Sequence, residues 1–126
     1  MSPNDPFENL RLDESEILRV LIRAAAVPCE VELLTQVKDA KVSERSGTWL
    51  RLAVSELAPR AACPDGPLPI RGLVVDESGR TTGFLLLWLR GGLLASLEHA
   101  WVTDDVPTSL PGPDQITAVR PQGWRS

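Results

Sequence analysis

Hydrophobic and polar residues follow a helical period in the first third of the chain. Over residues 17–25 apolar side chains cover one broad side, and charged residues cover the other. Asp13 with Glu16 three positions later predicts a capping box at the helix start. Pro28 predicts its end, because proline excludes helical geometry at the residue before it. A second, shorter helix is expected from about Cys29 to Val37.

The remainder of the chain changes to the two-residue period of strands. Within 48–54, for example, three aliphatic residues alternate with Trp49, Arg51 and Ala53. The predicted strands are 40–45, 48–54, 70–76, 81–90 and 93–102. Gly91-Gly92 fits the two-residue turn of a hairpin. The pattern therefore predicts an α+β fold, α-α-β-β-β-β-β, with two N-terminal helices packed on one face of a mostly antiparallel five-stranded sheet.

The length of 126 residues fits a single domain spanning 1–126. Residues 1–11 are expected to form a loose N-terminal arm. Four prolines keep 55–69 irregular, and four more make 103–126 a proline-rich C-terminal tail.

Strand 81–90 is apolar on both faces. If Gly91-Gly92 is a plain two-residue turn, Leu89 pairs with Leu94 and Phe84 faces His99. The core face is then expected to hold Phe84, Leu86, Trp88, Leu97, His99 and Trp101. Two short helices can cover only one face of such a sheet.

The second face is expected to carry four leucines, Leu85, Leu87, Leu89 and Leu94. The 55–69 segment, the tail with its Trp124, or another chain must then cover them. Exposed apolar patches usually mark interfaces. These four leucines and Trp124 are therefore candidate partner-binding residues, either for a protein partner or for a homodimer through the second sheet face.

Composition narrows the class of protein. Apolar residues make up 43% and charged residues 24%, a globular balance. The net charge of −4 gives no electrostatic reason to bind nucleic acid or an anionic membrane. There is no apolar run of the roughly 20 residues that a membrane span requires, and the polar N-terminal segment does not resemble a signal peptide. The expected location is cytoplasmic.

Candidate chemistry is sparse. His99 is the only histidine, and the strand period places it apart from its neighbour Glu98. Cys29 lies at a helix start, where the helix dipole favours a thiolate, although cysteine is more often a buried packing residue. With Trp101 these residues form a candidate ligand-binding site. No motif indicates a catalytic residue, a metal site or a cofactor.

Three motifs resemble the C-terminal half of small uncharacterised actinobacterial α+β proteins. They are Gly83-Phe84-Leu85-Leu86-Leu87-Trp88 with Gly91-Gly92-Leu93, Ser96-Leu97-Glu98, and Leu110-Pro111-Gly112-Pro113. Many of those proteins carry a cysteine- and glycine-rich turn after the helices. The matching stretch here, 44–48, has no cysteine, so the resemblance implies no metal at that turn. It supports the fold and adds no activity.

These observations predict a small non-enzymatic protein-interaction module, of an accessory or immunity type. The alternative is a small-ligand-binding protein or an unrecognised enzyme with a pocket near His99, Trp101 and Cys29.

Overall fold

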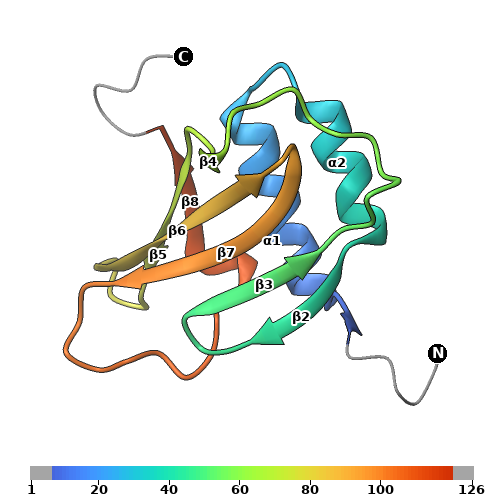
Figure 1. Cartoon of the computed structure of the whole chain (residues 1–126). Coiled ribbons are helices and arrows are strands. Elements are labelled where there is room, and N and C mark those ends of the chain that lie inside the picture. Colours follow the sequence, from blue (N-terminus) through green and yellow to red (C-terminus); the bar gives the residue numbers. More distant parts are fainter. Residues whose placement is uncertain (1–6, 121–126) are drawn as a thin grey trace.

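The structure is a computed structural model that describes residues 7–120 (Figure 1). Its elements follow the chain in the order β1 (Glu8–Asn9), α1 (Leu12–Ala25), α2 (Glu30–Asp39), β2 (Lys41–Arg45), β3 (Trp49–Ala53), β4 (Gly66–Pro67), β5 (Arg71–Val75), β6 (Thr81–Arg90), β7 (Leu93–Trp101), the 3₁₀ turn η1 (Pro113–Gln115) and β8 (Ile116–Val119). Neither helix in this part of the chain is long and apolar enough to cross a membrane.

One sheet contains all the described strands, in the order β1-β2-β3-β7-β6-β5-β8, with β4 also paired to β6. Every described pair is antiparallel. The α+β class and the antiparallel sheet are confirmed, but the predicted number of five strands is wrong, since the sheet has eight. The additional strands β1, β4 and β8 lie in the three segments expected to be irregular. Each is short and pairs at a sheet edge or beside prolines, where local sequence pattern is weakest.

Helix α1 begins earlier than the expected cap at Asp13. Arg11 precedes the first helical residue, and its backbone N–H donates to the Glu14 carboxylate at 2.8 Å. The capping carboxylate is therefore Glu14 and not Glu16. The helix ends at Ala25 and is followed by Ala26, which adopts a left-handed conformation (φ 51°) two residues before Pro28.

The buried residues of both helices form one cluster with buried residues of the strands. In Figure 1 both helices lie behind the sheet, and the near face of the sheet carries no helix. Helix α1 approaches the sheet closely at Gly72 of β5. A β-carbon at that position would lie 3.1 Å from a methyl group of Leu21 in α1 and 3.5 Å from the β-carbon of Leu85 in β6. We call the sheet surface toward the helices the inner face and the opposite surface the outer face.

The expected assignment of faces on β6 is wrong. Leu85, Leu87 and Leu89 are at most 3% exposed and belong to the core cluster. The three alternating side chains expected in the core, Phe84, Leu86 and Trp88, are only partly buried. Leu94 is also buried, so the four leucines that were expected on the second face belong to the cluster that contains the buried helix residues.

A β-bulge in β7 accounts for a second difference, the placement of Leu97 and His99 on the same face as Leu85 and Leu87. Leu89 pairs with Leu94 as predicted, but Trp88 pairs with Ser96, so one extra residue, Ala95, interrupts the ladder. Beyond the bulge His99 faces Leu85 and not Phe84. An inserted residue reverses the two-residue alternation. This is why Leu94 and Leu97, three positions apart, can both be buried.

The irregular segments contribute to the same core and not to the outer face. Ala61 and Leu68 from the segment between β3 and β5 are buried in the cluster, and Leu110, Ile116 and Ala118 pack against it. Both segments therefore pack in the cluster that holds the four leucines, as two of the three expected covers, but on the same face as residues of the helices. Trp124 lies outside the described residues.

Candidate interaction surface

The outer face of the sheet is built from strand positions that alternate with the buried ones. On β3 the core holds Leu50 and Leu52, so Trp49 and Arg51 lie outward, as the alternation in 48–54 predicts. On the neighbouring strands the outward apolar side chains are Leu73, Phe84, Leu86 and Trp88, all partly buried. Among the described residues no helix lies over them (Figure 1).

Arginine side chains stack on two of these aromatic rings. The guanidinium of Arg51 lies 4.5 Å from the ring centroid of Trp49, and that of Arg71 lies 4.9 Å from the centroid of Phe84. Such cation–π contacts are favourable and leave the outer edges of the guanidinium free to donate hydrogen bonds. The outer face therefore combines apolar area with positive charge.

A hollow of about 480 Å³, which we call the β3–β7 groove, lies on this face where the two strands separate. Its lining residues are Trp49, Arg51, Leu52, Ala53, Val54, Arg90, Leu93, Leu94, Ala95 and Ser96. The β3–β7 ladder stops at Arg51 and Ser96. The groove thus begins at the last paired residues and is lined by both apolar and polar side chains.

Gln36 of α2 binds the start of β7 just beyond the end of the β3–β7 ladder. Its side chain is fully buried, and its Oε1 accepts the Leu94 N–H at 2.9 Å. Its Nε2 donates to the carbonyls of Gly92 at 2.9 Å and Pro59 at 2.8 Å. A buried amide with its hydrogen bonds satisfied is costly to displace. The Leu94 N–H is therefore bound to α2 and does not extend the ladder with β3.

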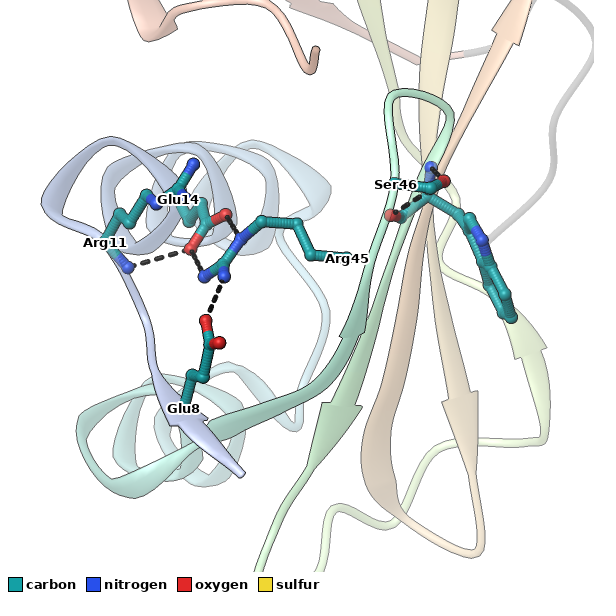
Figure 2. A network of polar contacts seen from close by, with 6 residues as sticks. Glu8, Arg11, Glu14, Arg45 and Ser46 are labelled. Carbon is teal, nitrogen blue, oxygen red and sulfur yellow. Dashed lines mark hydrogen bonds and ion pairs between the residues drawn. The ribbon is translucent and has the colours of Figure 1, made fainter. Parts of the chain in front are cut away.

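A second polar feature lies at the start of α1 (Figure 2). The Arg45 guanidinium contacts Glu14 through Nε at 2.8 Å and Nη2 at 2.9 Å, and Glu8 through Nη1. The Glu14 side chain is 7% exposed, whereas Glu8 is 71% exposed. The network joins β1 and α1 to β2, whose Arg45 lies 31 residues beyond Glu14 in the sequence.

The electrostatics of this network favour a charged Glu14. Burial by itself raises the pKa of Glu14, but the hydrogen bonds from Arg45 and from the Arg11 backbone outweigh it and hold the pKa below the ordinary value of 4.5. A hollow of about 400 Å³ adjoins the network, with Ser46, Gly47 and residues 108–112 on its far side. Arg45 already has two carboxylate partners, so the arrangement is best explained as a structural clamp.

His99 lies at the opposite end of β7 from the Gly91-Gly92 turn. It is 5% exposed, and neither ring nitrogen has a hydrogen-bond partner among the described residues. Burial lowers the pKa of His99, and the Gly47 backbone, which is near but does not complete a hydrogen bond, opposes that shift only in part. The imidazole is therefore a neutral side chain packed in the core, beside Gly83.

The candidate ligand site of His99, Trp101 and Cys29 is only partly assembled. His99 and Trp101 line one shallow hollow together with Thr48 and Trp49. Cys29 does not line that hollow, and it forms a disulfide with Cys63. The segment after Cys63 leads into β4, which pairs with Leu89 near the turn end of β6. The disulfide also removes the thiol that a reactive Cys29 would need, which the sequence analysis did not anticipate.

Within residues 7–120 no group of three or more His, Cys, Asp or Glu side chains is placed to hold a metal ion. Compared with protein families, curated proteins and solved structures, the chain matches none. The resemblance to small actinobacterial proteins therefore remains an expectation, and the surface must be interpreted from its own geometry.

Sequence reasoning missed the arginines of the outer face. Their signal was present in the alternation of β3, where Arg51 follows Trp49 by two positions and must share its face. The position of Arg71 beside Phe84 depends instead on the β5–β6 pairing of Leu73 with Phe84, which no local pattern determines.

Proposed function

We propose that this chain is a non-enzymatic protein-interaction module that binds its partner through the outer face of the sheet. The observation that carries the proposal is the row of outward apolar side chains on β6, Phe84, Leu86 and Trp88, over which no described helix lies. Contiguous apolar surface with an arginine and aromatic composition is typical of protein interfaces. The four leucines first expected to bind the partner are part of the core and support this surface from beneath.

A small-ligand-binding protein or an enzyme is the alternative. It would use the shallow hollow at His99 and Trp101. The burial of the His99 ring and the distance in the fold between that hollow and the Cys29–Cys63 disulfide favour the interaction module.

The disulfide also bears on the compartment. Disulfides persist in oxidising compartments and are rare in the cytosol. Cys29–Cys63 therefore favours an oxidising compartment over the cytoplasm expected from the sequence.

Site-specific photocrosslinking tests the proposed surface. A photoreactive amino acid is placed at Leu86 in the cell that produces the protein, and the control position is Leu57, which is 96% exposed and lies off the sheet. We expect one discrete crosslinked product from position 86 and none from position 57. The product should disappear when Trp88→Glu is added, because a charge on the same face opposes apolar docking.

Equal labelling at both positions, or no product from position 86, would contradict the proposal. Circular dichroism of the purified Trp88→Glu protein checks that the fold is intact. If that variant unfolds, Thr117→Glu on the outward side of β8 offers a second substitution at an exposed position of the same sheet.

A further inference from the structure

The hollows of the described chain differ in charge. The hollow at the start of α1 contains Arg11 and Arg45 but also Asp13 and Glu14. The one beside η1 is lined by three acidic residues, Asp76, Glu77 and Asp114. The β3–β7 groove is lined by Arg51 and Arg90 and by no acidic residue. This groove is therefore a positively charged apolar site in a protein whose net charge is −4.

Both arginines have guanidinium groups available to a ligand. Arg51 stacks on Trp49 and meets Glu44 only at 3.9 Å, in a pair whose side chains are each 55% exposed. Exposed pairs of this length contribute little, so a ligand carboxylate can compete with Glu44. Arg90 is exposed at the end of β6, with no ion pair in the described structure.

The shape of the groove suits an extended chain. It lies where the β3–β7 ladder ends at Arg51 and Ser96, and the Leu94 N–H beyond that point is bound to Gln36. The walls offer Trp49, Leu93 and Ala95 for apolar side chains. A peptide lying along the strands would present alternate side chains to these walls and to the two arginines.

We infer that the partner docks an extended acidic peptide segment in the β3–β7 groove, with its carboxylates on Arg51 and Arg90 and its apolar side chains on Trp49 and Leu93. This inference rests on the proposed interaction function and names the partner's chemistry. Guanidinium groups bind carboxylates through paired hydrogen bonds, which supplies the charge selectivity. Glu98 stands on the same face between Trp49 and Leu86, so the carboxylates of the peptide belong at Arg51 and Arg90 and its apolar side chains beside Glu98.

Defined peptides test the inference by fluorescence anisotropy on the full chain. The probe is a labelled short peptide in which glutamate and leucine alternate, and the comparison peptide replaces glutamate by lysine. We expect binding of the acidic peptide only, weakening as salt is raised. The double variant Arg51→Glu/Arg90→Glu should weaken it about tenfold or more, whereas the matched control Arg23→Glu/Arg80→Glu, with exposed arginines away from the groove, should not.

Each other outcome overturns the inference. These outcomes are no binding of the acidic peptide, equal binding of both peptides, equal losses in both double variants, or binding only of a single-stranded oligonucleotide. Self-association of the chain through Leu86, seen by sedimentation, would assign the face to a second copy. If the charge reversals unfold the protein, Arg51→Gln/Arg90→Gln replaces them. If photocrosslinking at position 86 gives a product but the acidic peptide does not bind, the proposed function is retained and only the acidic partner is rejected. If photocrosslinking gives no product, the proposed function is rejected.

Discussion

Glu14 performs two tasks with one carboxylate. It accepts the N–H that precedes α1, and it pairs with Arg45 of β2. A buried charge that loses its partner is strongly destabilising, whereas an exposed pair contributes little. Glu14 and Glu8 contact the same guanidinium from environments of very different exposure, and this makes them a matched pair for measurement.

We predict that Glu14→Gln lowers the free energy of unfolding by about 1–3 kcal/mol, and Glu8→Gln by less than about 1 kcal/mol. Because the pKa of Glu14 is lowered in the folded state, its contribution is present above pH 4.5 and is lost as pH falls through the folded value. Urea denaturation of the three proteins at neutral and acidic pH measures both effects. Equal losses in the two variants would show that burial does not control this network.

His99 gives a pH dependence in the same direction, but one that begins at a higher pH. Its folded pKa lies below the ordinary 6.5, so below pH 6.5 the unfolded chain binds a proton more readily than the folded protein. Stability should therefore fall as pH is lowered through 6.5.

We predict that His99→Leu removes this loss, because the substitution replaces two buried nitrogens without partners by apolar atoms. Denaturation from pH about 7.5 to about 5.5, a window above most carboxylate titration, measures it. A wild-type stability that is constant across this window would contradict the placement of the ring in the core.

At the scale of elements, strand β6 contributes side chains to both the inner and the outer face of the sheet. Leu87 is fully buried on the inner face, and the adjacent Leu86 lies on the outer face. The two residues have the same side chain and neighbouring positions, and only their faces differ.

We predict that Leu87→Ala costs about 2–5 kcal/mol in stability, as for a buried leucine, and that Leu86→Ala costs about 1 kcal/mol or less. Thermal and urea unfolding of the two variants decides between the faces. A larger loss for Leu86→Ala would contradict the placement of Leu87 on the inner face.

At the scale of the whole molecule, several contacts fasten the segment between β3 and β5 to the rest. Cys63 bonds to Cys29 across a sequence separation of 34, and the Ala61 N–H donates to the Gly92 carbonyl at 2.9 Å. The Asp65 carboxylate accepts the Gly91 N–H at 2.8 Å. A proline-rich segment with few local contacts is thus held at both α2 and the β6–β7 turn.

We predict that removing the disulfide, by Cys29→Ala/Cys63→Ala or by reduction, lowers stability by about 3–4 kcal/mol through the lost constraint on the unfolded chain. Denaturation with and without reductant measures this, and the double variant should not respond to reductant. Thiol labelling of protein taken directly from the producing cell gives the oxidation state there. Two free thiols in that sample would contradict an oxidising compartment.

Local pattern in the sequence determined the helices, the five longer strands and the Gly91-Gly92 turn, because a helical or two-residue period needs only neighbours along the chain. It also placed Trp49 and Arg51 on one face of β3. The observed start of each helix differs from the predicted start by one or two residues. At α1 the Arg11 N–H donates to Glu14, and the sequence offers several nearby acidic residues that could equally have accepted it.

Only the tertiary structure decided which face of β6 is inside. Both faces are apolar, so hydrophobicity is uninformative there, and the single extra residue at Ala95 reverses every position beyond it. The short strands β1, β4 and β8 and the Cys29–Cys63 bond depend likewise on partners distant in the chain. Such contacts form because packing brings the segments together, and no stretch of sequence by itself contains that information.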